Sequence, residues 1–174
     1  SCLAPATVIL TSATGSLIAS SACRTQTVAT GDNYFVDAGC NLFAKIVPQG
    51  GSPVAGSVST CVTFNGTVQF HNGQPYLQRH YDIEPAVNAS TSTARITLYA
   101  TQAEFDAVNA ADLLLGDNWP DLPTGPADAA GIAAVKVTQW HGTPLSLPSS
   151  PGNYTDPNAI YVIPASVTWN AAST

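Results

Sequence analysis

Residues 79–84, Arg-His-Tyr-Asp-Ile-Glu, form the densest cluster of ionisable side chains in a chain with only 5 basic and 11 acidic residues. In an extended segment, His80, Asp82 and Glu84 would share one face. Acid–base catalysis by two carboxyl groups needs partners that face each other at a defined distance, and the sequence does not show such a pair. We therefore interpret this cluster as a strand with an ion pair across its edge.

The three histidines and the known catalytic motifs offer no further chemistry. His71, His80 and His141 do not have the spacing of a metal site. The sequence contains no Gly-x-Ser-x-Gly nucleophile elbow, no His-Glu-x-x-His motif and no phosphate-binding glycine loop. Because no set of residues supplies a nucleophile, a base and a group that orients the base, we expect no enzymatic activity and no catalytic residue.

Two loops rich in Asp and Asn, 31–33 and 117–121, carry oxygen atoms of the kind that bind a structural calcium ion. Such residues more often form Asx turns, so we expect no metal and no cofactor. Trp119 lies between Asn and Pro in the second loop. An exposed indole can stack on a sugar ring, and Trp119 is therefore the candidate ligand-binding residue.

The composition excludes two classes of partner. Charged residues make up 9% of the chain, hydrophobic residues 45%, and the net charge is −6. Nucleic-acid binding needs a basic face, which five isolated basic residues do not form. No apolar run approaches the ~20 residues of a membrane helix. The expected surface consists of small neutral side chains and favours contacts between proteins.

The cysteines and the absence of methionine indicate an exported protein. A missing initiator is expected after cleavage of a secretion signal, so we predict an extracellular or cell-surface location. An even number of cysteines in an exported chain favours two disulfides, whereas four free thiols would suit a reducing cytosol. Three pairings of Cys2, Cys23, Cys40 and Cys61 remain open. We favour Cys2–Cys23 and Cys40–Cys61, each closing one hairpin-sized loop.

Short runs of β-branched and aromatic residues, separated by turn residues, recur along the chain. The clearest is 93–100, where Ile96 and Leu98 alternate with polar neighbours. A capping box, Thr101 to Glu104, then begins a predicted helix that Gly116 can end. Its apolar stripe consists of Phe105, Val108, Ala111 and Leu115. The predicted strands are 6–12, 16–20, 25–30, 34–36, 40–48, 54–65, 67–70, 75–83, 93–100, 132–140, 159–163 and 166–169. Between 67–70 and 75–83, Asn72-Gly73 favours the left-handed turn of a hairpin.

This pattern predicts a mainly β fold. We expect an immunoglobulin-like β-sandwich with one short α-helix over about 101–115, stabilised by disulfides. Residues 1–24 are assigned to an amino-terminal strand segment, and residues 25–174 to the β-sandwich domain.

Residues from about 34 to 170 resemble a module of secreted and surface proteins of Bacteroidetes, often found ahead of a type IX secretion sorting domain. The resemblance rests on QPYLQRHYDIEP (74–85), TARITLYATQAEFDAVN (93–109), DAAGI (128–132), WHG (140–142) and VTWN (167–170). It implies a secreted β-sandwich and no catalytic set. In that family one or two further strands usually follow the Trp-Asn segment, so the resemblance also implies that the final strand is missing here.

A sheet without its closing strand has an open edge, which another segment should fill. We therefore expect a structural subunit that polymerises head to tail with copies of itself, each copy lending an amino-terminal donor strand to the next. The alternative is a module that binds polysaccharide or a host surface through Trp119. The donor strand is assigned to Thr7, Val8, Ile9, Leu10 and Thr11.

Overall fold

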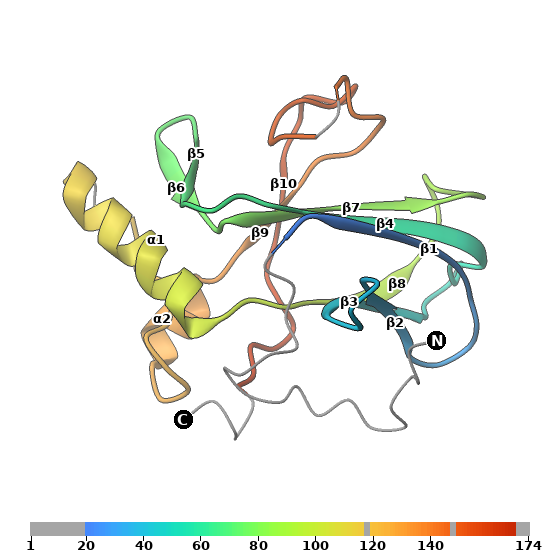
Figure 1. Ribbon diagram of the computed structural model, residues 1–174, viewed down its shortest axis with the longest axis horizontal. Coiled ribbons are helices and arrows are strands. Elements are labelled where there is room, and N and C mark those ends of the chain that lie inside the picture. The colour runs from blue at the N-terminus through green and yellow to red at the C-terminus, as the bar shows by residue number, and fades with distance from the viewer. Residues whose placement is uncertain (1–19, 117–118, 147–148, 170–174) are drawn as a thin grey trace. The chain divides into compact units, whose positions relative to one another are not determined.

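The computed structural model describes residues 20–116, 119–146 and 149–169 (Figure 1). The fold is mainly β, as predicted, with ten strands and two helices in this part of the chain. The strands are β1 Ala22–Val28, β2 Asn33–Val36, β3 Leu42–Pro48, β4 Gly56–Phe64, β5 Gln69–His71, β6 Gln74–Tyr76, β7 Arg79–Pro85, β8 Ala94–Leu98, β9 Val137–Gln139 and β10 Ile160–Val162. The helices are α1 Gln102–Leu115 and α2 Ala129–Ala134.

The contacts divide the described chain into two compact units. The first contains residues 20–64 and 81–100, and the second contains residues 65–80 and 101–169. The sequence pattern predicts one domain over residues 25–174, so it does not indicate the boundary between these two units.

The first unit contains two three-stranded sheets that share one apolar core. Their strand orders are β1-β4-β7 and β2-β3-β8, and the sheets form two layers in Figure 1. β1 runs antiparallel to β4, and β3 runs antiparallel to both β2 and β8. This layering agrees with a sandwich, while immunoglobulin-like connectivity stays a prediction. The core consists of Val28, Phe35, Phe43, Ala44, Ile46, Val54, Val58 and Val62.

A bulge in β3 explains why two consecutive residues of this strand enter the core. Phe35 pairs with Ala44, but the next residue, Val36, pairs with Leu42, so Phe43 has no partner of its own. At a bulge the extra residue can point to the same side as its neighbour. Phe43 and Ala44 are accordingly both fully buried, and the Phe35 and Phe43 rings lie 6.5 Å apart between centroids.

The predicted disulfide pairing is wrong. Cys23 is bonded to Cys61, which is its register partner on the neighbouring strand of the β1–β4 pair. Cys40 is also disulfide-bonded, and Cys2 lies outside the described residues. The pairing was predicted from loop length along the chain, whereas the bond is decided by strand register. Disulfide bonding itself agrees with a protein that is not cytoplasmic.

The second unit contains the predicted helix. The side chain of Thr101 accepts a hydrogen bond from the backbone N–H of Glu104, whose carboxylate accepts one from the N–H of Thr101. Gly116 ends the helix in the left-handed conformation. The helix therefore begins and ends at the predicted residues. Of the predicted apolar stripe, however, only Val108 is buried, while Leu115 is exposed.

Two predicted strands of the second unit are wrong in whole or in part. Within 132–140 only β9 is extended, because the alanine-rich start belongs to α2, which Asp128 caps by accepting the Gly131 N–H. A side chain at Gly131 would meet the backbone of Pro123, so α2 can pack this closely only with glycine there. Residues 166–169 form no strand, and Trp169 instead donates to Gln102 Oε1 at 3.0 Å.

β5 and β6 form the predicted hairpin. Asn72 and Gly73 both have positive φ at its turn, as Asn-Gly turns require. The predicted strands at 6–12 and 16–20 fall largely on residues outside the described part of the chain.

Arg79, at the start of β7, forms a buried ion pair with Glu104 of α1. The Nη2–Oε1 distance is 2.6 Å, and Nε donates to the same oxygen at 2.7 Å. Glu104 thereby serves both the capping box and the ion pair. The 79–84 cluster lies on a strand, as predicted, but the partner of Arg79 is a residue of α1 and does not lie across the edge of the strand.

Loss of the Cys23–Cys61 bond will lower the free energy of unfolding. The bond spans 38 residues of sequence, for which the chain-entropy model gives about 4 kcal/mol. We expect this loss in Cys23→Ala/Cys61→Ala, measured by denaturant unfolding. The control is Thr25→Ala, which removes the exposed hydrogen bond to Ser59 on the same strand pair and should cost at most about 1 kcal/mol. Equal losses in both variants would contradict the role of the disulfide.

Glu104→Gln will destabilise the second unit strongly, because it leaves the Arg79 guanidinium buried beside a neutral amide. Breaking one partner of a buried pair costs about 3–5 kcal/mol. The matched control is Lys45→Met, which breaks the exposed Lys45–Asp32 pair and should have a far smaller effect. Denaturant unfolding measures both, and a Glu104→Gln variant as stable as the control would refute this assignment.

Candidate functional site

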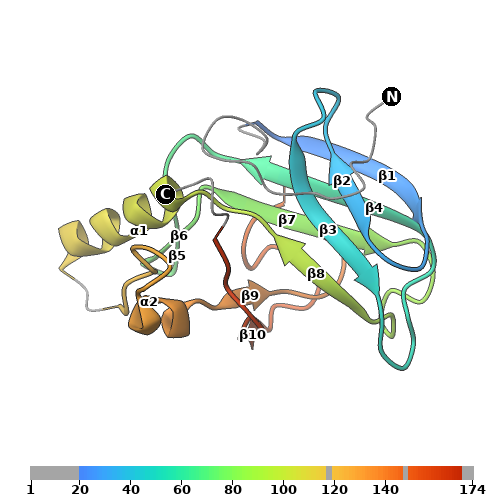
Figure 2. The same ribbon diagram turned by 90° about the horizontal axis from the view of Figure 1, so that it is seen from below.

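The outer edge of β8 leaves the core of the first unit uncovered. β8 pairs with β3 on one side and is the last strand of its sheet among the described residues, as Figure 2 shows. Ile46 of β3 and Ile96 of β8 are register partners, so both side chains point to the core side of the sheet. Ile46 is 1% exposed, but Ile96 is 42% exposed. The core therefore opens to solvent along β8.

The other residues of β8 agree with this orientation. Ala94, two residues before Ile96, packs against the core cluster. Arg95 and Thr97 point to the opposite, outer face. β8 thus offers an apolar inner row, a polar outer row and a strand edge with no neighbour in the described structure.

The outer face of this sheet carries a small polar network. Asp32 accepts hydrogen bonds from the Tyr34 hydroxyl at 2.9 Å and from Lys45 Nζ at 3.3 Å. These two hydrogen bonds, the one from Tyr34 first, lower the pKa of Asp32 below its usual value. Burial raises the pKa of Tyr99 to about 12, and the charges of Tyr34 and Asp32 add to that shift.

In the candidate calcium loop 31–33, the Asp32 carboxylate and the Asn33 side chain already have hydrogen-bond partners within the protein. The Asn33 amide accepts from the Ala29 N–H and donates to the carbonyls of Ala29, Gly31 and Ile46. These hydrogen bonds close the turn. The carboxylate of Asp32 forms an ion pair with Lys45. Residues 117 and 118 of the second loop lie outside the described part. Across the described ranges, no group of three His, Cys, Asp or Glu side chains is placed to hold a metal ion.

A second apolar edge lies in the other unit. β9 and β10 form a two-stranded antiparallel sheet in which Tyr161 pairs with Thr138 and Val162 with Val137. Every residue of β10 is exposed, and so is Ile163, which follows it. Successive residues of a strand point to opposite faces, so both faces of β10 present large apolar side chains to solvent.

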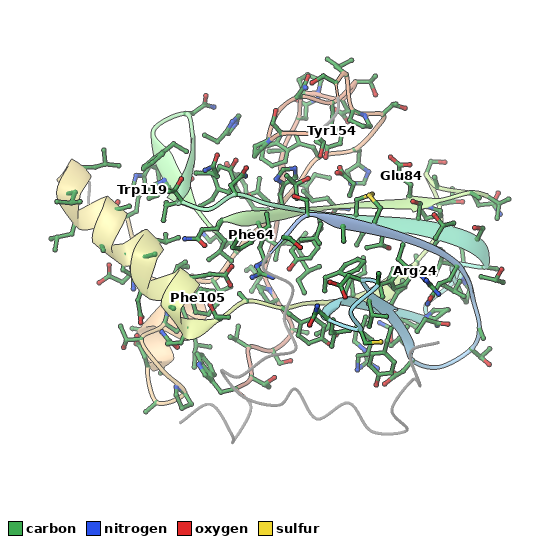
Figure 3. The ribbon with its side chains drawn as sticks, in the orientation of Figure 1. Arg24, Phe64, Glu84, Phe105, Trp119 and Tyr154 are labelled. Carbon is green, nitrogen blue, oxygen red and sulfur yellow. A yellow bond between two sulfur atoms is a disulfide. The ribbon has the colours of Figure 1, made fainter. Side chains whose placement is uncertain are left out.

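Trp119 is 46% exposed and lies in the second unit, where Figure 3 labels it. The end of α1 presents three consecutive exposed leucines, of which Leu114 is 88% exposed. The other two tryptophans are engaged within the unit. Trp140 contacts the His71 ring edge-on at 5.3 Å between centroids, and Trp169 donates to Gln102. Trp119 is thus the tryptophan that the structure leaves available for a ligand among those described.

His80 and Ser149 form the pair that most resembles a catalytic constellation. His80 Nε2 lies 3.0 Å from Ser149 Oγ. Ser149 is buried, so its hydroxyl cannot reach a substrate in this conformation. The pair joins two distant segments of the chain, as a structural hydrogen bond does.

The remaining predicted site residues, Thr7, Val8, Ile9, Leu10 and Thr11, lie outside the described part of the structure. The sequence predicts an open edge but does not indicate that β8 and β10 are the strands with exposed edges. The signal for β10 was present, because Ile-Tyr-Val-Ile is a run of four large apolar residues without alternation. No local signal distinguishes Ile96 from a buried isoleucine, because its exposure depends on which strands pair.

Comparison with known proteins gives no match to a family model, a curated protein or a solved structure. Neither helix of the described residues is long and apolar enough to cross a bilayer.

Proposed function

We propose that this protein is a non-enzymatic extracellular structural subunit that polymerises into a fibre or pilus-like filament. Copies join by strand complementation, with the amino-terminal segment of one copy adding to the edge of β8 in the next. The observation that carries this proposal is the exposure of Ile96 on the core side of β8, opposite the buried Ile46. An added strand would pair with the free edge and cover Ile96.

The alternation of the donor segment would fit this edge in part, with Ile9 as the exception on the polar face. In an extended donor, Val8 and Leu10 share one face, and Thr7, Ile9 and Thr11 share the other. Val8 and Leu10 would lie beside Ile96 on the core side. The threonines would lie beside Thr97 on the outer side, where Thr–Thr pairs are favourable cross-strand neighbours.

Such a contact propagates without closing, because donor and acceptor are different surfaces of the same chain. Burial of one large apolar side chain contributes about 1.5–3 kcal/mol, and several would be covered at each junction. The disulfides and the resemblance to secreted modules of Bacteroidetes support an extracellular location for the filament.

Deletion of Thr7–Thr11, which keeps Cys2, is expected to abolish filaments in negative-stain electron microscopy of purified protein. A finer test substitutes two neighbouring residues whose side chains would point to opposite faces of the donor strand. Leu10→Asp would place a carboxylate against the open core and should block assembly. Thr11→Asp would place the same group on the solvent side, beside Arg95, and should leave filaments intact. On the acceptor side, Ile96→Asp should also block assembly.

Filaments that persist after the deletion, or that respond equally to Leu10→Asp and Thr11→Asp, would overturn the proposal. A wild-type protein that stays a monomer at all concentrations would do the same. Circular dichroism of each variant separates a failure to assemble from a failure to fold.

The exposure of Trp119 favours a second candidate function, a module that binds polysaccharide or a host surface. Trp119→Ala would then reduce binding of a monomeric protein to a glycan array at least tenfold. Trp119→Phe is the matched control, because it keeps an aromatic ring for stacking and should retain part of the binding. Binding that is absent in the wild type, or equal in the wild type and Trp119→Ala, would exclude this candidate.

A further inference from the structure

The β9–β10 ribbon is an unusual surface for a protein that stands alone. A two-stranded sheet is marginally stable in water, and three or more strands are normally needed. β10 has β9 as its one neighbour among the described residues, so its other edge is free. Tyr161 is 66% exposed and Ile163 is 75% exposed, on one face of that edge, while Ile160 and Val162 are exposed on the other.

Of the features that normally protect an edge strand, β10 has a short length of three residues and lacks the others. Natural proteins place Lys, other charges, proline or a bulge on exposed edges to prevent pairing between molecules. β10 contains none of these, and residues 157–169 contain no charged side chain at all. Like-charge repulsion between copies is therefore absent along this strip, although the chain as a whole carries a net charge of −6.

We propose that β10 pairs antiparallel with β10 of a second copy, forming a four-stranded sheet of order β9-β10-β10-β9 across a two-fold axis. This surface is distinct from the β8 edge and lies in the other unit. A second copy is the occupant that the sequence of β10 fits best, because the strand is self-complementary in one register.

The geometry of an antiparallel pair limits that register. Residues directly opposite each other share a face, so a two-fold axis between identical strands must pass through a residue paired with itself. An axis at Tyr161 pairs the two Tyr161 rings with each other and Ile160 with Val162. An axis at Val162 would pair Tyr161 with Ile163 and Ile160 with Pro164, and both Ile163 and Pro164 lie beyond the end of β10.

The register centred on Tyr161 is therefore favoured. It combines an aromatic pair with two pairs of β-branched residues, which are the stabilising classes of cross-strand neighbours. It also brings both edges of β10 into ladders and covers apolar surface on both faces.

This contact is isologous and closes after two copies, unlike the open-ended contact at β8. A few residue pairs give a weak contact between two single molecules. Repeated along two filaments, the same contact would be strengthened by multivalency and would join the filaments side by side.

A single-cysteine substitution tests this register in the full chain. Among the described residues no cysteine is free, so an added thiol has no competing partner there. Tyr161→Cys would face its own copy across the axis, within the Cα separation that a disulfide spans. Under mild oxidation we expect most of the Tyr161→Cys protein to migrate as a covalent dimer on non-reducing gels.

Ile163→Cys is the matched control. Its side chain is more exposed than Tyr161, so random collisions would favour it. In the proposed register its two copies lie about 13 Å apart along the ladder, too far for a disulfide. We expect at least tenfold less dimer. Equal dimer formation by the two variants, or none by Tyr161→Cys, would overturn the proposal.

The same experiment on Leu10→Asp protein separates this inference from the proposed function. Covalent dimers of Tyr161→Cys should form in that background as well, because β10 does not depend on the donor strand. Tyr161→Lys gives a second readout in the otherwise unchanged chain. It should leave single filaments intact and reduce their lateral bundling, and undiminished bundles would contradict the proposal.

Discussion

A strand at the margin of a sheet keeps one row of backbone donors and acceptors without a ladder partner, and its core-side residues lie where the core ends. In the first unit β1, β7, β2 and β8 all lie at a margin among the described residues, and β8 is the one whose core-side isoleucine is exposed. Ile46 and Ile96 are opposite each other on the same face, yet one is buried and the other is not. The free edge and the exposed isoleucine are two costs at one place, and a single added strand would remove both. The proposed assembly follows from this coincidence.

Local signals in the sequence were sufficient for elements whose stability is local. The capping box from Thr101 to Glu104 and the glycine that ends α1 act within one or two turns, and both are found as predicted. The Asn72-Gly73 turn is equally local. Interactions between distant segments were less accessible. Cys23 pairs with Cys61 because β1 and β4 are neighbours in register, and loop length along the chain carries no information about that.

The same distinction separates the predicted from the missed parts of the candidate site. The pattern in 93–100 correctly indicates a strand with Ile96 on its apolar face, but the exposure of that face depends on which strands follow β3 in the sheet. Segment 132–140 mixes a helix and a strand because the Asp128 cap and the close approach of Gly131 to Pro123 override a short alternation. Glu104 acquires its second role only through Arg79, 25 positions earlier.

The two exposed edges differ in how they are protected, and the difference bears on their roles. β8 carries Arg95 on its outer face, so a strand added there would place its outer side chains beside a cation. β10 has no charge on either face. The shape of its side chains and the pairing register would therefore determine which strand can pair with it. A low charge content lets apolar edges meet, while the net negative charge still opposes random association. In the proposed assembly one edge would form an open-ended contact and the other a closed one, so the first would govern growth along a filament and the second the lateral association of filaments.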